Sequence, residues 1–486
     1  MLARPQGRES LPYPDSVLDL APGGIVVVPS IDYRPLRYEP SPGVEHLEER
    51  MLFVLLWLKR PGLQIAYVTS TALDPILIAD YMRFLPDAEE AASRLELVAL
   101  DDPRHRPLSR KLLMRPDVTG GLRRFAARAK PTWLLPFKVT EDEIELSSLL
   151  GLPLFGPSPE ALYYGTKSGG RTAGRLAHAR LPEGQADLRS MRDVEQAVDT
   201  LLARNHGTEG VVVKLNHGVG GLGHAIVDEP LSHVPLSSAA TTFGSAFHSW
   251  STYEKEIEDQ GAVVEELIRG RNLTSPSVQM VIAPDGSLRE LSTHDQILEG
   301  RHMQNYKACR FPARVEYRRL IQKRAADVGK VLTSLGIRGF FSVDFLVRPE
   351  DSSQCLYLCE INLRMSATTL PRFVTQELTG ARYHERTGDL IADGRPKFYM
   401  ATDGLQSNSY VGLTAQAVLD DLHLNGLDYN RELSKGVVPH MLGALGSYGR
   451  LGVTCIADSS READDLYAQV QAFLDRLASL PRRAAS

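Results

Sequence analysis

Residues 211–227 read VVVKLNHGVGGLGHAIV, in which two apolar runs enclose four glycines, and this segment constrains the fold more than any other. Apolar, β-branched runs of this length predict a strand, a glycine-rich loop and a second strand. Glycines allow backbone N–H groups to approach phosphate oxygens closely, and Lys214 adds a positive charge at the base of the loop. The loop is interpreted as a phosphate-binding cradle or, alternatively, as a mobile hairpin tip.

The letters GVGGLG also match the dinucleotide-binding fingerprint G-x-G-x-x-G. That fingerprint requires a helix directly after the glycines, because the helix N-terminus binds the pyrophosphate. Residues 225–227 instead continue as an apolar run typical of a strand. The sequence therefore argues against a nicotinamide site.

Length and charge exclude several classes of protein. The chain has 486 residues, enough for about three domains, and a net charge of -5, which argues against non-specific nucleic-acid binding. Its first long apolar run, residues 51–58, is far shorter than the ~20 residues that cross a bilayer, and the start lacks a signal-peptide core. The four cysteines form no C-x-x-C pair, which favours reduced thiols in a cytoplasmic protein without membrane partners.

Strand and helix patterns alternate between residues 23 and 155, after a proline-rich segment at residues 1–22 that we expect to be a flexible lead-in. The alternation predicts a Rossmann-like α/β domain with a parallel sheet. The predicted strands are residues 25–28, 63–68, 95–100 and 131–135. The predicted helices are residues 44–58, a segment opened by Asp74-Pro75, and residues 110–130.

A second informative segment lies at residues 341–361, where two apolar runs flank a polar turn and predict an antiparallel hairpin. If Arg348 faces Gln354 across the turn, Asp344 faces Leu358 and lies diagonal to Glu360.

Asp344, Glu360 and Asn362 would then share one face of otherwise apolar strands. Burying two carboxylates there is costly unless a cation lies between them. The all-oxygen ligand set predicts Mg²⁺, with Mn²⁺ as the alternative ion, and a solvated acidic surface is the alternative interpretation. Arg364 follows two residues later as a candidate phosphate or oxyanion contact.

Three further segments carry candidate residues. Lys167 precedes a predicted helix at residues 171–179, either as a phosphate-facing cation or as a solvated lysine. Residues 261–268 (GAVVEELI) predict a strand. Residues 293–313 are polar and basic with little periodicity, typical of a substrate loop or of a plain surface loop. The candidate substrate contacts in this loop are His294, Asp295, Gln296, Arg301 and Tyr306.

In this order, the two lysines, the glycine loop, the EELI strand and the D…E-x-N-x-R hairpin resemble the ATP-grasp superfamily. The resemblance implies an α/β and α+β multidomain protein that binds ATP and magnesium. It implies phosphate contacts at Lys167, Lys214, Gly218, Gly220, Gly221 and Gly223, an adenine linker at Glu265, Glu266 and Ile268, and metal ligands at Asp344, Glu360 and Asn362. Many members carry a ribose-binding glutamate where this chain has Asn272.

Several stretches, such as VEHLEERMLFVLLWL, GTKSGGR and GVVPHMLGALGSYGRLGVTCIADSS, resemble the pheganomycin-type peptide ligases. This implies ATP-dependent joining of a carboxylate to the amine of an amino acid or peptide through an acyl phosphate, in peptide natural-product biosynthesis, and a homodimer is expected from other ligases of the superfamily. D-alanine ligases carry an oxyanion-binding arginine where this chain has Ser342, so Arg364 and then Arg310 are the candidates for that role.

The expected domains are residues 23–155 (Rossmann-like), 156–396 (ATP-grasp) and 397–486 (C-terminal α+β region). Within the second, residues 156–270 are expected to carry the lid and linker, and residues 271–396 the metal and substrate half. The alternatives to a ligase are an ATP-grasp kinase of a small metabolite and an ATP-binding regulatory protein without turnover.

Overall fold

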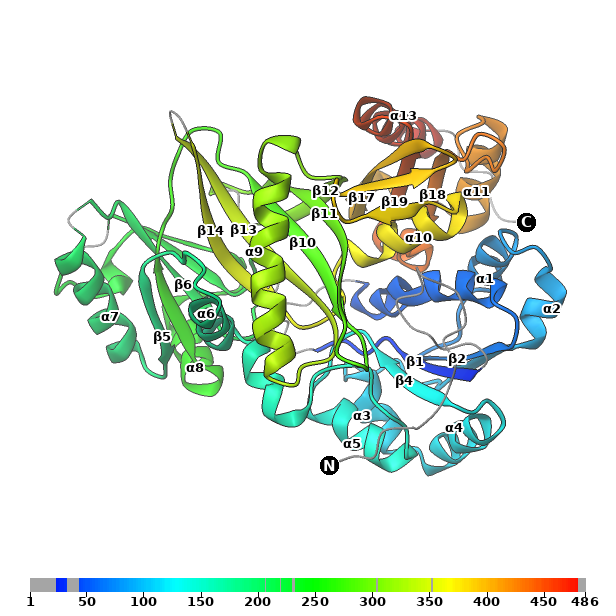
Figure 1. Cartoon of the computed structure of the whole chain (residues 1–486), viewed down its shortest axis with the longest axis horizontal. Helices are drawn as coiled ribbons and strands as arrows, with labels where there is room; N and C mark the ends of the chain where they lie inside the picture. The colour runs from blue at the N-terminus through cyan, green and yellow to red at the C-terminus, as the bar shows by residue number, and fades with distance from the viewer. Residues whose placement is uncertain are drawn as a thin grey trace.

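The computed structural model describes residues 23–32, 43–205, 207–218, 220–229, 232–302, 305–350 and 353–479. Its strands form three sheets of four, five and ten strands (Figure 1). The lead-in predicted at residues 1–22 lies outside the described residues. Within those ranges, no helix is long and apolar enough to cross a membrane.

The N-terminal sheet is parallel, with the strand order β3-β2-β1-β4. Ile25 and Val27 of β1 pack into one hydrophobic core and Val26 and Val28 into another, so both faces are covered, as a parallel sheet requires. The Rossmann-like prediction is confirmed. The strands are β1 (Gly23–Val28), β2 (Leu63–Thr69), β3 (Leu95–Ala99) and β4 (Thr132–Pro136). The helices are the 3₁₀ helix η2 (Val44–Lys59), α1 (Pro75–Met82), α2 (Ala88–Ser93), α3 (Leu108–Leu113), α4 (Pro116–Arg128) and α5 (Glu141–Leu150).

The single helix predicted over residues 110–130 is wrong, because two helices, α3 and α4, occupy this region. Arg115 separates them with an extended backbone (φ -123°, ψ 78°). The following Pro116 disfavours helical geometry at the residue before it, and it then begins the second helix.

The five-stranded sheet has the order β5-β9-β6-β7-β8 and contains the glycine loop. Strands β6 and β7 are antiparallel, with Lys214 opposite His224, so the predicted strand–loop–strand is present. The buried Tyr253 hydroxyl donates to the carbonyl oxygens of Val213 (2.8 Å) and Gly223 (2.9 Å), which fixes the neck of the hairpin. The elements are η3 (Pro159–Gly165), α6 (Lys167–Leu176), β5 (Gly184–Leu188), α7 (Met191–Arg204), β6 (Gly210–Leu215), β7 (His224–Asp228), η4 (Leu236–Ser238), β8 (Thr241–Phe243), α8 (Trp250–Gln260) and β9 (Ala262–Glu266).

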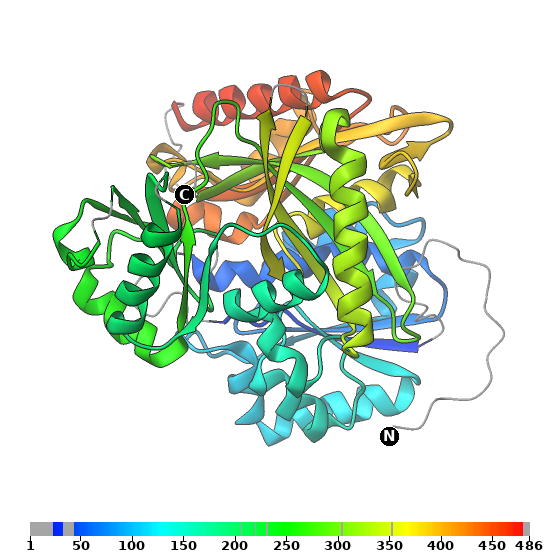
Figure 2. The same cartoon turned by 60° about the vertical axis from the view of Figure 1, so that its left-hand side comes forward.

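The ten-stranded sheet runs from β14 and β13 through β10, β11 and β12 to the C-terminal strands, and α9 lies lengthwise along it (Figure 2). Its first half comprises β10 (Ser275–Ile282), β11 (Leu288–Glu299), β12 (Asn305–Phe311), α9 (Val315–Ser334), β13 (Gly339–Glu350) and β14 (Ser353–Asn362). The loop predicted over residues 293–313 is therefore wrong, because β11 and β12 occupy most of it as an antiparallel pair.

The C-terminal part continues the same sheet, since β17 pairs with β12 and also with β19. The domain boundary predicted at residues 396 and 397 falls inside β17, whereas the other two internal boundaries fall between elements. This part comprises α10 (Thr369–Thr379), β15 (Arg382–His384), β16 (Asp389–Ala392), β17 (Arg395–Gln406), η5 (Asn408–Tyr410), α11 (Ala415–Leu424), β18 (Gly436–His440), η6 (Leu442–Ala444), α12 (Leu445–Tyr448), β19 (Arg450–Ala457) and α13 (Ser460–Ser479).

The N-terminal and C-terminal parts share one hydrophobic core. Phe53 of η2 stacks on Phe373 of α10 with ring centroids 5.2 Å apart, and Trp57 meets the same ring edge-on. Aromatic pairs of this kind stabilise a contact beyond the area they bury. The packing places η2 beside the C-terminal strands.

Candidate active site

A cleft of 1430 Å³ lies between the three sheets. Its walls come from η2 and the segment after β4, from the glycine loop and β9, from β10, β11, β13 and β14, and from β17 and β19. Clefts at domain junctions are typical sites for small molecules, and this one is larger than the ~300–1,000 Å³ of most ligand pockets. Most of the candidate residues line it.

The two predicted metal-binding carboxylates face each other directly. Asp344 pairs with Glu360, because a bulge between Asp344 and Phe345 leaves Cys359 without a cross-strand partner. The predicted pairing of Asp344 with Leu358 was wrong by two residues. Arg348 faces Cys355 rather than Gln354 across the turn, which accounts for one residue, and the bulge accounts for the other, so Phe345 lies opposite Leu358. Together the two shifts place the carboxylates at opposite rather than diagonal positions, which brings them closer together.

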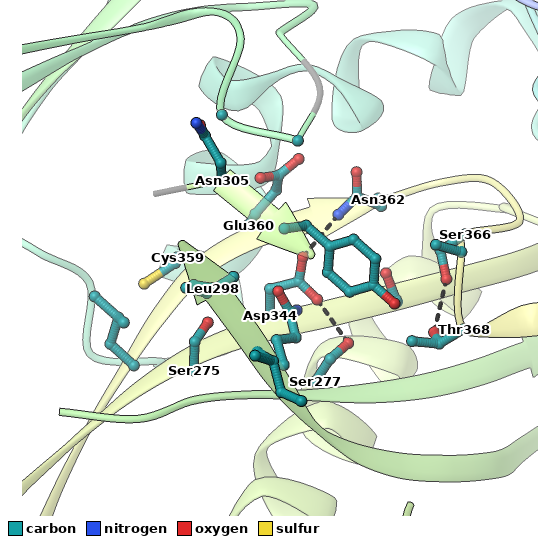
Figure 3. Close-up of a pocket in the computed structure, with 18 of the residues that line it drawn as sticks. Ser275, Ser277, Leu298, Asn305, Asp344, Cys359, Glu360, Asn362, Ser366 and Thr368 are labelled. Atoms are coloured by element: carbon teal, nitrogen blue, oxygen red, sulfur yellow. Dashed lines mark hydrogen bonds between the residues drawn. The ribbon is translucent and has the colours of Figure 1, made fainter. Parts of the chain in front are cut away.

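Hydrogen bonds hold Asp344 in place. Its Oδ1 accepts from Ser277 Oγ at 2.6 Å and its Oδ2 accepts from Asn362 Nδ2 at 3.0 Å (Figure 3). Burial, followed by the facing Glu360 carboxylate, raises the pKa of Asp344 to about 6. Burial alone would raise the pKa of Glu360 as well, but Lys167 and Arg364 outweigh it and lower this pKa.

This donor set fits a hard cation. Two carboxylates and one amide oxygen are oxygen ligands, and the repulsion between Asp344 and Glu360 is the kind that a cation between them relieves. In the described part of the chain, no group of three or more His, Cys, Asp and Glu side chains could hold a metal ion. An ion bound here would therefore take its remaining ligands from water or substrate, as Mg²⁺ commonly does.

Both predicted lysines reach this region and pair with carboxylates. Lys167 Nζ forms an ion pair with Glu360 and donates to the Gly218 carbonyl oxygen at 3.1 Å. It is the first residue of α6, capped by the Thr166 side chain, rather than a residue before the helix as predicted. Lys214 Nζ lies 2.5 Å from Glu265 Oε2. Burial alone would lower the pKa of Lys214, but Glu265 outweighs it and raises this pKa.

Sequence reasoning missed Arg171. Its Nη1 lies 2.5 Å from Glu265 Oε1, and its Nη2 donates to the Pro182 carbonyl oxygen at 3.0 Å. The Glu265 carboxylate, which lines the cleft, is thus buried between Arg171 and Lys214. The sequence feature that could have identified Arg171 is its spacing, because it follows Lys167 by four residues and therefore lies on the same helix face.

The predicted glycines fall into two groups. Gly220 and Gly221 line the cleft at the tip of the hairpin, with φ values of 56° and 90°. Gly218 and Gly223 lie at the neck, where a Cβ on Gly223 would come within 2.7 Å of the Gly218 Cα. The neck glycines therefore allow the backbones to approach closely, and the tip glycines provide the exposed part of the loop.

The residues predicted to contact adenine, ribose and substrate also line the cleft, except for His294. The residues on its walls include Glu266, Ile268, Asn272, Asp295, Gln296, Arg301, Tyr306 and Arg310. His294 is fully buried on the opposite face of β11, with its Nε2 2.6 Å from the Tyr399 hydroxyl, and burial lowers its pKa to about 3. Its prediction as a substrate contact was wrong, because the His294 ring packs against the buried rings of Phe311 and Tyr399.

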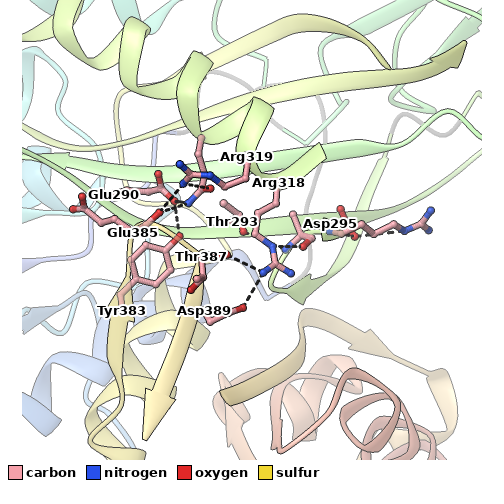
Figure 4. A network of polar contacts seen from close by, with 12 residues as sticks. Glu290, Thr293, Asp295, Arg318, Arg319, Tyr383, Glu385, Thr387 and Asp389 are labelled. Atoms are coloured by element: carbon pink, nitrogen blue, oxygen red, sulfur yellow. Dashed lines mark hydrogen bonds and ion pairs between the residues drawn. The ribbon is translucent and has the colours of Figure 1, made fainter. Parts of the chain in front are cut away.

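A polar network supports the wall that carries Asp295 (Figure 4). Asp295 Oδ1 accepts from the Tyr317 hydroxyl at 2.6 Å. Arg318 Nη1 contacts Asp389 Oδ1 at 2.8 Å and donates to the Thr387 carbonyl oxygen at 3.0 Å, which ties α9 to the β15–β16 hairpin. These contacts tie the wall that carries Asp295 to α9.

The two candidate oxyanion arginines lie in different surroundings. Arg364 Nη2 donates to Asn362 Oδ1 at 3.0 Å, and its Nη1 donates to the Met365 carbonyl oxygen at 2.8 Å. Arg310 Nε donates to Asp464 Oδ1 of α13 at 2.7 Å. Arg364 therefore adjoins the carboxylate pair, whereas Arg310 is tied to the C-terminal helix.

Solved structures with the same fold cover nearly the whole chain. One is a biotin carboxylase from Campylobacter jejuni, with a TM-score of 0.59, 13% identity, and 94% of this chain and 95% of that chain covered. Another is an ADP complex of N5-carboxyaminoimidazole ribonucleotide synthetase, with a TM-score of 0.56, 12% identity, and 94% and 98% covered. At such low identity the likeness concerns the fold alone.

Family models match two parts of the chain. The model described as "IQCH-like, ATP-grasp" matches residues 228–382, which include the carboxylate hairpin. The match identifies an ATP-grasp domain in this part of the chain. A second model, described as the PGM1 C-terminal domain, matches residues 417–470.

Two curated proteins are related to this ATP-grasp chain. It is 29% identical over 460 residues to the L-propargylglycine–L-glutamate ligase of Streptantibioticus cattleyicolor, with 92% of this chain and 93% of that protein covered. It is 21% identical over 398 residues to the IQ motif-containing protein H of Danio rerio, with 70% of this chain but only 37% of that protein covered. The predicted family and its resemblance to peptide-forming ligases are confirmed.

Proposed function

We propose that this ATP-grasp enzyme is an ATP-dependent ligase that joins a carboxylate to the amine of an amino acid or peptide through an acyl phosphate. The observation that carries the proposal is the meeting of Lys167, Lys214 and the carboxylate pair at one cleft. The similarity to an amino-acid ligase along almost the full length of both chains supports it. By analogy with that ligase, we place the reaction in peptide natural-product biosynthesis.

ATP phosphates would be held by Lys167, Lys214 and backbone N–H groups of the glycine loop. Mg²⁺, or alternatively Mn²⁺, would be held by Asp344, Glu360 and Asn362. The bound ion would neutralise phosphate charge, which phosphoryl transfer requires. Because Lys167 is paired with Glu360 and Lys214 with Glu265, phosphate binding would exchange those partners.

Oxyanion stabilisation and the exclusion of water are assigned to an arginine and to the glycine loop. Arg364, beside the carboxylate pair, would stabilise the oxyanion formed when the amine attacks, and Arg310 is the second candidate. The glycine loop would close over the phosphates and exclude the water that hydrolyses an acyl phosphate.

The other predicted residues are assigned to the adenine, the ribose and the amino-acid substrates. Glu265, Glu266 and Ile268 would line the adenine, and Asn272, whose φ of 57° turns the chain after the linker, would lie near the ribose. Asp295, Gln296, Arg301 and Tyr306 would face the amino-acid substrates. A homodimer and a cytoplasmic location, the latter consistent with four free cysteines, are part of the proposal.

The test is incubation of the full chain with ATP, Mg²⁺ and pairs of amino acids, beginning with L-propargylglycine and L-glutamate. A ligase yields ADP, phosphate and an amide detected by mass spectrometry. A kinase would yield ADP and a phosphorylated metabolite without free phosphate. A regulatory protein would show a thermal shift with ATP and no ADP, and either of these two results would overturn the proposal.

A further inference from the structure

Two arginines and an aspartate meet in the cleft wall where the N-terminal and C-terminal parts of the chain come together. Arg50 belongs to η2, Asp403 to β17, and Arg450 begins β19. Arg50 Nη2 donates to Asp403 Oδ2 at 2.7 Å, and Arg450 Nε donates to the Asp403 backbone oxygen at 3.1 Å. All three line the cleft, although they are far apart in sequence.

An irregularity in β17 gives Asp403 this position. The pairing of β17 with β19 shifts register between Thr402 and Leu405, so Asp403 and Gly404 form a bulge. Bulges re-aim side chains and are frequent beside active sites. Asp403 is only 8% exposed, and Arg50 and Arg450 outweigh its burial to lower its pKa, so it is ionised and holds both arginines.

The arginines retain hydrogen-bonding capacity. Arg50 Nε is buried and has no hydrogen-bond partner within the residues that the structure describes. The neighbouring His440 is buried, and burial lowers its pKa to about 4, so it adds no charge at neutral pH. Two guanidinium groups against one carboxylate leave one positive charge, and a buried donor without an acceptor is unfavourable. A carboxylate would neutralise this charge and accept a hydrogen bond from this donor, because the planar guanidinium matches its two oxygens.

This cluster adjoins the reacting groups. The guanidinium carbon of Arg50 lies 5.7 Å from the centroid of the Phe137 ring, and that of Arg364 lies 6.0 Å from the same centroid. Arg364 in turn donates to Asn362 of the predicted metal site. A small molecule held by Arg50 could therefore extend past one aromatic ring to the oxyanion position.

We propose that Arg50 and Arg450 bind the free α-carboxylate of an amino-acid substrate, and that Asp403 positions both arginines for this contact. The inference rests on the proposed ligase function and adds a substrate-binding role for the C-terminal part, which supplies Asp403 and Arg450. The site selects for an uncapped α-carboxylate, so an α-carboxamide of the same amino acid is a poor ligand.

A direct test is labelling of arginines by phenylglyoxal in the full chain with ADP and Mg²⁺, read by peptide mass spectrometry. Each proteinogenic L-amino acid and its α-carboxamide is added in turn, and Arg476, exposed in α13, serves as the internal control. At least one free amino acid is expected to slow labelling of Arg450 about fivefold or more, the scale of a net hydrogen bond, while its amide does not. Equal protection by the amide, or none by any amino acid, overturns the proposal.

A kinetic test uses the amino-acid pair with the highest ADP release. Arg450→Gln is expected to raise the KM of one amino acid about tenfold or more, as for a lost charge-assisted hydrogen bond, without changing the KM for ATP. Arg450→Lys should recover part of this loss, and Arg476→Gln should match the wild type. A change confined to the KM for ATP would refute the site. Protection of Arg450 without any ADP release would refute the ligase function while the carboxylate site stands.

Discussion

Replacing Asp344 with asparagine is expected to stabilise the ligand-free protein while it abolishes ATP turnover. The pKa of Asp344 in the folded state is raised to about 6 by burial and by Glu360. Because an unfolded aspartate has a pKa of about 3.9, the folded state loses stability as the pH rises from about 4 through 6. Two pKa units correspond to about 3 kcal/mol, which the ionised pair costs at pH 8.

Asparagine removes this cost but changes one hydrogen bond. Ser277 Oγ can still donate to the remaining oxygen, whereas Asn362 Nδ2 would meet a second amide nitrogen and lose about 1 kcal/mol. The net gain in the free energy of unfolding is therefore about 2 kcal/mol at pH 8. It should shrink to about 0.5 kcal/mol at pH 5, where only about half of the cost of ionisation applies, because folded Asp344 is largely protonated but the unfolded aspartate is already ionised.

Urea unfolding of both proteins at pH 8 and pH 5, without nucleotide or Mg²⁺, measures this gain. Asp465→Asn, at an exposed position on α13, is the matched control and should change little at either pH. An Asp344→Asn protein that is less stable than the wild type at pH 8, or equally altered at both pH values, would show that the carboxylate pair is not the source of strain we infer.

Three further predictions concern the same cleft. Lys214→Ala and Glu360→Ala should each abolish ADP release while the protein remains folded by circular dichroism, and near-wild-type turnover in both would contradict the phosphate and metal assignments. Arg171→Met should lower the free energy of unfolding by about 3–5 kcal/mol in urea, because the buried Glu265 loses one of its two cations; a loss under 1 kcal/mol would mean that Lys214 alone suffices. Gly223→Ala should lower the melting temperature more than Gly151→Ala, because a Cβ at Gly223 would meet the Gly218 backbone, whereas a Cβ at Gly151 meets open space and only its positive φ of 67° opposes the change; the reverse order would contradict the close approach at the neck.

Local patterns were sufficient for most elements of the fold. The apolar runs of β1, β2 and β4 and the glycine loop between β6 and β7 were predictable because strand periodicity and glycine content act over a few residues. The order of the two lysines, the loop and the hairpin was enough to identify the superfamily. The break at Pro116 was also local and was available from the sequence.

The remaining site features depend on pairing and on long-range contacts. The register at the turn and the bulge at Cys359 each shift the partner of Asp344 by one residue, from Leu358 to Glu360, and no residue type in the hairpin signals either shift. His294 and Asp295 are neighbours in sequence, yet only the placement of β11 in the sheet decides which of them faces the cleft. Arg50 and Asp403 are too far apart in sequence for a local pattern to predict their contact. Such contacts follow from tertiary packing.

The ion pairs that line the cleft make nucleotide binding an exchange of partners. Lys167, Lys214 and Arg171 already neutralise Glu360 and Glu265, so the site has little excess charge with which to attract a bare triphosphate. A nucleotide that takes the lysines leaves Glu360 in need of another cation, and a nucleotide that arrives with its own divalent ion supplies one. We therefore expect nucleotide and metal to be thermodynamically coupled through a single carboxylate: each should tighten the binding of the other, and neither should bind well alone.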